Sequence, residues 1–266
     1  MQVIGLCRFS YPAIGGFQVE HDSIEERIAY LYDETRLAQR FALFQNVALP
    51  CLRAQTDQDF TFIIVIGESL PEQHIARLLQ ITKDIPQIQI QAHPPLPQRQ
   101  IMKRVLQDAR ISPHEPCLQF RHDDDDAVAV NFIERLRKAQ RDSATLCAQH
   151  RAVAFDFNMG YIAEFNASGI AASEIYRPFN VAALGMYVKG NDPLTIMNFA
   201  HDKLPRFMPA VSFPDERMFV RAHHAFNDAR QKKVKHIPVE PLSEDQELEF
   251  LKRFAINADH IRETFA

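Results

Sequence analysis

The amino-acid sequence predicts an α/β fold in which a mostly parallel, Rossmann-like sheet is flanked by helices and followed by an irregular C-terminal half. Apolar runs of strand length alternate with segments of helical periodicity across the first half of the chain, which is the pattern of a parallel sheet covered by helices. Of the 266 residues, 46% are hydrophobic, enough for a sizeable core. We therefore expect one domain over residues 1–266, regular over 1–140 and less regular over 141–266.

The first predicted elements are a strand over residues 3–9 and a helix that begins after Asp33. Leu37 and Phe41 fall on one face of this helix because they lie four residues apart. Pro50 interrupts or restarts the helix, since proline lacks the amide hydrogen that a helix interior needs.

Residues 60–66 (FTFIIVI) form the clearest predicted strand. The run is continuous, rich in β-branched side chains and ended by Gly67, as expected of a central strand that is buried on both faces. A helix beginning at Pro71 follows, with Ser69 as its expected N-cap. A shorter strand over residues 88–92 continues the alternation.

The next elements lead into an acidic segment. Residues 98–109 are predicted to be helical, and the brief apolar strand 117–120 leads into four consecutive aspartates. These are Asp123, Asp124, Asp125 and Asp126, hereafter the acidic turn. Helical spacing resumes over residues 129–136. In open parallel sheets, ligands bind outside the carboxyl ends of the strands, which is where the acidic turn falls.

The second half of the chain has weaker patterns. The predicted elements are strand-like pieces at 144–148 and 181–188, a mobile loop at 158–177, helices at 193–203 and 215–224, and a terminal helix with Leu248, Leu251 and Ala255 on its apolar face.

Charge and composition exclude several classes of protein. The formal net charge of −4 gives no reason to expect a nucleic-acid partner, because such proteins usually carry a basic stripe. The four cysteines lie far apart, with no pair at C-x-x-C spacing, which favours buried free thiols in a reducing compartment. No apolar run reaches the length of a transmembrane span, and no basic leader precedes the first strand. We expect a cytoplasmic protein, for which peripheral contact with a membrane stays open.

Four consecutive aspartates repel one another, so a fold tolerates them where a cation or solvent compensates. Mg²⁺ or Mn²⁺ fits, because both prefer oxygen ligands and often share them with substrate phosphates. Asp123 and Asp125 are two residues apart, so in an extended segment both face one cleft. The alternative is a solvated acidic turn that caps the next helix.

Other charged residues lie near predicted strand ends. Arg8 ends the first strand at the same sheet edge as the acidic turn, where it can meet a diphosphate or base, or pair with the acids. Arg121 is placed to pair with the acids as well. Asp57 and Asp59 precede a strand, so they either contact a nucleotide or make local backbone hydrogen bonds.

Four segments have recognisable motifs: FRHDDDDA at 120–127, QTDQDF at 55–60, RLAQRF at 36–41 and MFVRAHHAFN at 218–227. Together they resemble a family of bacterial rhamnosyltransferase-type proteins with a GT-A-like fold. The last departs from the family pattern by Phe219 in place of tryptophan and Ala225 in place of glycine, without moving its histidine or Asn227.

The resemblance implies a nucleotide-sugar-binding half over residues 1–140 and an acceptor-side half, including the C-terminal helix, over 141–266. It implies that Asp123 and Asp124, with Arg8, Arg121, Asp57 and Asp59, contact the nucleotide sugar, and that Asp125, Asp126 and His224 hold Mn²⁺ or Mg²⁺. His223 points elsewhere. For an inverting reaction, the predicted helix at 215–224 offers Asp215 and Glu216 as the base that deprotonates the acceptor, although acidic residues are also ordinary at a helix start.

The expected function is a metal-dependent glycosyltransferase that moves a sugar, with rhamnose suggested by the family name, from a nucleoside-diphosphate sugar to a hydroxyl of a glycan or small-molecule acceptor. A metal-dependent phosphohydrolase is the alternative enzyme, because clustered aspartates and a histidine also suit two-metal chemistry. A non-enzymatic, cation-stabilised binding module is disfavoured by the missing D-x-[DN]-x-[DN]-G loop. The donor base, acceptor, stereochemistry and oligomeric state do not follow from these residues.

Overall fold

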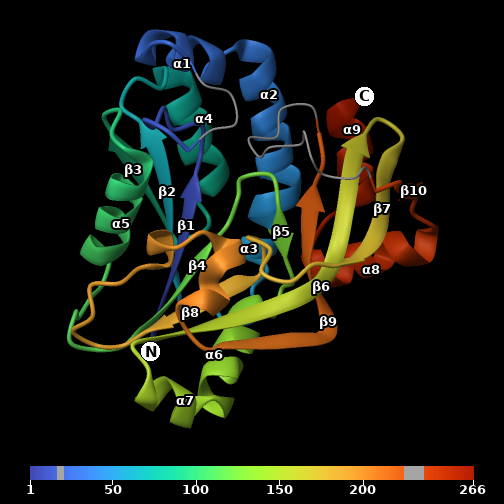
Figure 1. Ribbon diagram of the computed structural model, residues 1–266. Helices are drawn as coiled ribbons and strands as arrows, with labels where there is room; N and C mark the ends of the chain where they lie inside the picture. Colours follow the sequence, from blue (N-terminus) through green and yellow to red (C-terminus); the bar gives the residue numbers. More distant parts are fainter. Residues whose placement is uncertain (17–20, 225–236) are drawn as a thin grey trace.

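A computed structural model of the chain describes residues 1–16, 21–224 and 237–266. Four parallel strands form the first part of a mixed sheet, in the order β4–β1–β2–β3 (Figure 1). Their bounds are β1 Gln2–Arg8, β2 Thr61–Gly67, β3 Ile88–His93 and β4 Cys117–Arg121. All four strands were predicted, so the parallel α/β half of the prediction is confirmed.

Helices connect these strands. They are α1 Ile24–Leu31, α2 Glu34–Leu43, the π-helical η1 Phe44–Ala48, α3 Leu49–Arg53, α4 Glu72–Thr82, α5 Gln98–Asp108 and α6 Phe132–Asp142. The Asp33 carboxylate caps α2 by accepting the amide hydrogen of Arg36, and Pro50 lies in the first turn of α3, where proline is tolerated. The N-cap of α4 is Pro71, so the prediction that Ser69 caps this helix is wrong.

The strands β1 and β2 are buried on both faces, and alternate side chains enter two separate cores. Val3, Cys7 and Ile64 pack into a large core together with side chains of α2, α3 and α6. Leu6 and Ile63 enter a second core with side chains of α5. The continuous apolar runs of these strands follow from this double burial.

Gly5 in β1 makes room for two aromatic rings from the neighbouring strands. The ring centroids of Phe62 and Phe120 lie 6.0 Å apart. A Cβ atom at residue 5 would lie 2.3 Å from Cζ of Phe120 and 2.6 Å from Cδ2 of Phe62. Glycine is therefore required by packing at this position, because core side chains leave no spare volume.

The second half of the chain extends the same sheet with pairings that are antiparallel except for the parallel pair β6–β9. Its strands are β5 Ala127–Val128, β6 Ala152–Asn166, β7 Gly169–Tyr176, β8 Leu184–Val188, β9 Ala210–Ala222 and β10 Glu240–Pro241. β8 pairs with both β4 and β6, and β6 pairs with β7, β8 and β9. One sheet therefore runs through both halves of the chain.

Three assignments of secondary structure in this half are wrong. The segment predicted as a strand at 144–148 is the helix α7, Ala144–Gln149. The predicted mobile loop at 158–177 is largely the β6–β7 hairpin, in which Gly160 allows the backbone of Phe219 to approach closely. The helix predicted at 215–224 lies mostly in β9, because its residues pair with β6 and β5.

The predicted strand at 181–188 contains β8, and two short 3-10 helices, η2 Ile196–Asn198 and η3 His201–Arg206, occupy part of the predicted helix at 193–203. The C-terminal helices α8 Glu244–Phe254 and α9 Ala258–Phe265 follow, and α9 contacts β6 and β7 (Figure 1). Leu248 and Leu251 are exposed, and α8 instead buries Phe250 and Phe254. The predicted apolar face of the terminal helix is therefore wrong. In the described part of the chain, no helix is both long enough and apolar enough to span a bilayer.

Candidate functional site

A pocket lies at the carboxyl ends of β1 and β4, where the sequence predicts it. Arg8 ends β1, Arg121 ends β4, and the two strands are hydrogen-bonded neighbours. The residues that line the pocket are Arg8, Gly16, Arg40, Gln98, Arg121, Asp123, Asp124, Asp125, Asp126, Val181, His201 and Arg221. Four arginines and four aspartates therefore face one cavity.

The acidic turn is largely buried rather than solvent-facing. Asp123 is exposed, whereas Asp124, Asp125 and Asp126 retain only 2–5% of their accessible surface. The alternative of a solvated acidic turn therefore does not hold for these three residues. Burial of three adjacent carboxyl groups requires compensating charges and hydrogen bonds, since uncompensated buried charges are costly.

Each buried carboxyl group of the acidic turn has a protein partner. Asp124 Oδ1 lies 2.5 Å from Nη1 of Arg40 on α2, and the same guanidinium lies 3.6 Å from Asp125 Oδ2. Asp125 Oδ2 is 2.8 Å from Nε2 of His224. Asp126 Oδ1 accepts the amide hydrogen of Ala222 at 3.0 Å. The end of β9 and the helix α2 therefore hold the turn in place.

These contacts separate the pKa values of two neighbouring carboxyl groups. Burial alone raises the pKa of Asp125, but the hydrogen bond from His224 and the charge of Arg40 outweigh it and lower that pKa below its usual range. Burial and the nearby Asp125 and Asp123 raise the pKa of Asp126 well above its usual range. Of these two adjacent carboxyl groups, Asp125 is therefore the more readily ionised.

The turn has the donor set of a site for a hard cation. Asp123, Asp125 and Asp126 each offer one carboxylate oxygen, and these oxygens lie within 4.8 Å of one another. Mg²⁺ and Mn²⁺ prefer such ligands. Asp124 is not in this set, and its carboxylate contacts Arg40. Asp124 also lines the pocket, so its contact with a nucleotide sugar stays a prediction.

The histidines at the end of β9 point in different directions. His224 is buried against Asp125, although 99 residues separate them in sequence. His223 Nδ1 lies 3.3 Å from Oε1 of Glu164, away from the acidic turn. Ala225 and Asn227, which belong to the segment that resembles the family, lie outside the described residues.

Among the residues that the structure describes, protein groups contact three of the four arginines that line the pocket: Arg8, Arg40 and Arg221. Arg40 and Arg221 are held by protein groups, Arg40 by the acidic turn and Arg221 by Oδ1 of Asn180 at 3.1 Å. Arg8 donates to the carbonyl of Gly16 at 3.4 Å. Arg121 makes no ion pair with the acidic turn in the part of the chain described, contrary to expectation. Burial and the positive charge of Arg8 lower the pKa of Arg121, and the nearby Asp123 opposes them without reversing the effect.

Three further residues of the pocket were not among the predicted site residues: Arg40, Arg221 and His201. Arg40 and Arg221 lie in segments that resemble the family, which is the signal that could have identified them. His201 lies in η3, in a region without clear periodicity, and no sequence signal marks it.

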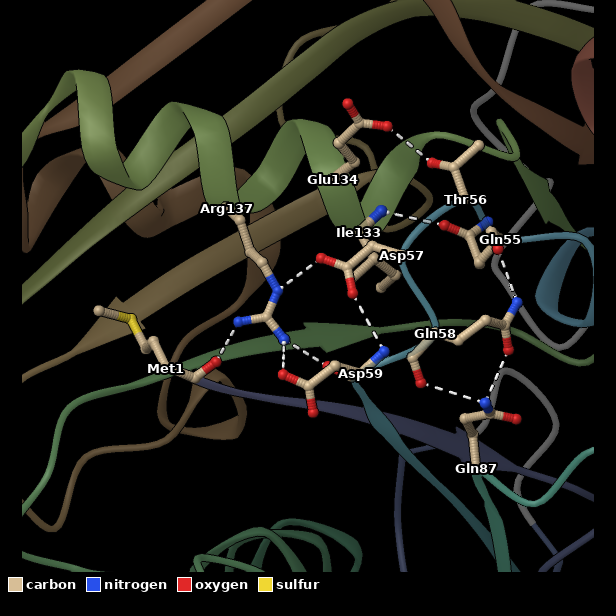
Figure 2. Close-up of polar contacts among 10 residues, drawn as sticks. All are labelled: Met1, Gln55, Thr56, Asp57, Gln58, Asp59, Gln87, Ile133, Glu134 and Arg137. Carbon is tan, nitrogen blue, oxygen red and sulfur yellow. Dashed lines mark hydrogen bonds and ion pairs between the residues drawn. The ribbon is translucent and has the colours of Figure 1, made fainter.

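Asp57 and Asp59 lie near the amino ends of the parallel strands, opposite the ends at which the pocket lies. They precede β2, whereas the pocket lies beyond the carboxyl ends of the parallel strands. Figure 2 shows both carboxylates bonded to the guanidinium of Arg137 on α6, each at 2.8 Å. The nearby Gln55 accepts the amide hydrogen of Ile133 at the start of α6 (Figure 2). Asp57 Oδ1 also accepts the amide hydrogen of Asp59 at 3.0 Å, so the alternative of local backbone hydrogen bonding is confirmed and nucleotide contact is not supported. Both carboxylates also fasten α6 to the start of β2.

Asp215 and Glu216 do not line the pocket either. They lie on β9 and form ion pairs with Arg135 of α6, with distances of 2.6 and 2.8 Å. Their predicted role as acceptor base assumed a helix start at this point, and the segment is a strand. The structure therefore gives both residues a role in joining β9 to α6.

The mixed α/β sheet carries clustered carboxylates and arginines at the carboxyl ends of its parallel strands, where open α/β folds bind their ligands. The chain belongs to the rhamnosyl transferase family, because the family model described as "Putative rhamnosyl transferase" matches residues 2–236. Among curated proteins, none matches the chain.

Solved structures that are similar to the chain include TarS from S. aureus and a protein from Desulfovibrio desulfuricans. Residues 1–349 of TarS from S. aureus are 10% identical, with a TM-score of 0.43 over 84% of this chain and 60% of that one. The same TarS fragment in complex with UDP-GlcNAc gives 11% identity and a TM-score of 0.45, over 86% of this chain and 60% of that one. A "putative nucleotide-diphospho-sugar transferase" from Desulfovibrio desulfuricans G20 is 12% identical, with a TM-score of 0.33 over 83% of this chain and 80% of that one. The chain thus spans about 60% of the length of the TarS fragment.

Proposed function

We propose that this protein is a metal-dependent glycosyltransferase that binds a nucleoside-diphosphate sugar at the acidic turn and transfers the sugar to a hydroxyl of a glycan or small-molecule acceptor. One observation carries the proposal: three carboxylate oxygens lie within 4.8 Å of one another in a pocket that Arg8 and Arg121 also line. Carboxylates alone suit a cation and arginines alone suit an anion. Together they suit a diphosphate bound beside a divalent cation.

The acidic turn supplies the cation ligands in this proposal. Asp123, Asp125 and Asp126 would hold Mn²⁺ or Mg²⁺, and His224 supports Asp125 through its hydrogen bond. When bound, the cation supplies Lewis-acid neutralisation of the leaving diphosphate. Arg40 has the separate task of balancing the charge of Asp124.

The two arginines at the ends of neighbouring strands would bind the diphosphate. Arg8 and Arg121 follow from adjacent parallel strands, so both guanidinium groups reach the same edge of the sheet. An arginine can bind phosphate oxygens through two parallel hydrogen bonds, which fixes their orientation as well as their charge. Rhamnose is the donor sugar that we propose on the basis of the family description.

The test is calorimetric titration of UDP, dTDP and GDP into the protein, with Mn²⁺ or with EDTA. At least one nucleotide should bind at least tenfold more tightly with Mn²⁺, and a ligand at 100 times its Kd should stabilise the folded state by about 2.7 kcal/mol. Asp125→Asn should abolish the effect of Mn²⁺, whereas Asp84→Asn, which changes an exposed carboxylate in an ion pair with Arg53, should not.

Equal nucleotide affinities with Mn²⁺ and with EDTA would contradict the metal-dependent part of the proposal and leave the arginines as the whole diphosphate site. Release of phosphate from a monophosphate ester, without cleavage of dTDP-rhamnose, would support the phosphohydrolase instead. The described residues contain one cluster suited to a metal ion, which gives that two-metal alternative no second site.

A further inference from the structure

His201 presents one ring nitrogen as a hydrogen-bond acceptor beside the acidic turn. The imidazole lines the pocket, and its Nδ1 lies 2.5 Å from the carbonyl oxygen of Phe179. A carbonyl can only accept, so Nδ1 carries the ring hydrogen. In the neutral ring, Nε2 is then the atom with a free lone pair.

The surroundings of His201 keep this ring neutral. Burial lowers the pKa of His201, and the positive charge of Arg121 acts in the same direction. The bond to Phe179 and the carboxylates of Asp202 and Asp123 oppose these effects without reversing them. At neutral pH the imidazole is therefore uncharged and able to accept a proton.

The carbonyl that fixes the tautomer of His201 belongs to a strained residue. Phe179 has φ of +53°, a left-handed conformation that is an outlier for a bulky side chain. Such strain costs about 1–3 kcal/mol and persists where the surrounding structure enforces it, often at functional sites.

A buried carboxyl group, Asp156 on β6, holds Phe179 in this conformation. Asp156 Oδ1 accepts the amide hydrogen of Phe179 at 2.8 Å, and Oδ2 accepts the hydroxyl hydrogen of Ser212 on β9 at 3.1 Å. Asp156 itself is 1% exposed. The sheet is thus linked to the ring of His201 through a single strained residue.

We propose that Nε2 of His201 is the base that accepts the proton of the acceptor hydroxyl, and that Asp156 and Phe179 are positioning residues for it. The inference rests on the proposed glycosyltransferase function and names a base for it in place of Asp215 and Glu216. As the acceptor O–H bond breaks, its proton moves to Nε2. The acceptor oxygen bonds to the anomeric carbon, and the electron pair of the breaking carbon–oxygen bond leaves with the nucleoside diphosphate. Direct displacement of this kind inverts the anomeric configuration.

The test compares wild type with His201→Asn and His201→Gln. The asparagine amide can still donate to the Phe179 carbonyl but has no group in place of Nε2. The glutamine amide reaches the Nε2 position but cannot take up a proton at neutral pH. His260→Gln, on the exposed face of α9, is the matched control. Thermal melting and titration of UDP, dTDP and GDP with Mn²⁺ report on folding and on the donor site.

We expect both His201 variants to bind nucleotide with Mn²⁺ within threefold of wild type. The rate of nucleoside diphosphate release from dTDP-rhamnose, UDP-GlcNAc or GDP-mannose, with water as acceptor if no other is known, should fall about 100- to 10,000-fold. In wild type, kcat/KM should rise with pH through an ionisation below about 6.5, because the neutral imidazole is the active form. This ionisation should be missing from both variants and present in His260→Gln.

A double-mutant cycle separates positioning from packing. Asp156→Asn should lower the rate in the wild-type background and leave the rate of His201→Asn unchanged, because it acts through His201. Additive effects, or His201 variants that keep the wild-type pH profile with a rate within threefold, would overturn the inference while leaving the donor site intact. A wild-type protein that neither binds the nucleotides nor cleaves the sugars would instead contradict the proposed function, and the inference with it.

Discussion

Replacing Arg40 should destabilise the protein far more than replacing a surface arginine that also forms an ion pair with an aspartate. Arg40 is 3% exposed, and its guanidinium contacts the buried carboxylates of Asp124 and Asp125. Arg40→Met keeps most of the side-chain volume and removes the positive charge that contacts Asp124. Removing one partner of a buried ion pair typically costs about 3–5 kcal/mol.

The assay is urea unfolding at pH 7 in EDTA, with the free energy of unfolding extrapolated to water. The matched control is Arg53→Met, because Arg53 makes a two-bonded pair with Asp84 at a site where the side chains are 42% and 53% exposed. Exposed pairs contribute about 1 kcal/mol or less. The double variant Arg40→Met/Asp124→Leu should recover much of the loss, since replacing a whole buried pair by apolar groups is often neutral. If Arg40→Met costs no more than Arg53→Met, the acidic turn does not depend on Arg40 for its charge balance.

Two further predictions concern other titratable residues, His122 and the pair Asp57 and Asp59. Burial lowers the pKa of His122 to about 4. The unfolded chain therefore binds a proton at this histidine at a higher pH than the folded protein does. About 3 kcal/mol of folding stability should be lost as the pH falls from about 6.5 to about 4. His122→Leu should flatten that part of the stability profile in urea unfolding, and an unchanged slope would contradict the assignment. The pair of substitutions Asp57→Asn and Asp59→Asn should leave Mn²⁺-dependent nucleotide binding within about twofold of wild type, because both carboxylates contact Arg137 and neither lines the pocket. A lost nucleotide site in calorimetry would restore the original prediction for these residues.

The parallel half of the fold could be predicted because its signals are local. The run at residues 60–66 is buried on both faces, and the helices after Asp33 and Pro97 have clear apolar faces. The second half depends on pairing between distant segments. Gly160 and Asn158 argue for a loop when read locally, yet β6 has partners on both sides that accommodate them. The residues of β9 carry no strand alternation strong enough to outweigh a helical interpretation.

The candidate site shows the same division between local and distant information. The acidic turn could be located because an apolar strand runs directly into four aspartates. Its burial could not be predicted, because it depends on Arg40 and His224, which lie 84 and 99 residues away from their partners. Asp57 and Asp59 were misassigned because an aspartate at a strand start looks the same in sequence whether it meets a nucleotide or an arginine.

The absence of a side chain at Gly5 also limits how this core can evolve. Because the rings of Phe62 and Phe120 occupy the space that a Cβ atom would need, an alanine at residue 5 is acceptable only after one of the two rings has become smaller. The order of substitutions is therefore constrained. One ring must first be replaced by a smaller side chain, and the protein then has a cavity in its core until residue 5 becomes larger. Family members with a larger residue at this position should carry a smaller side chain at one of the other two, so the three positions are expected to vary together.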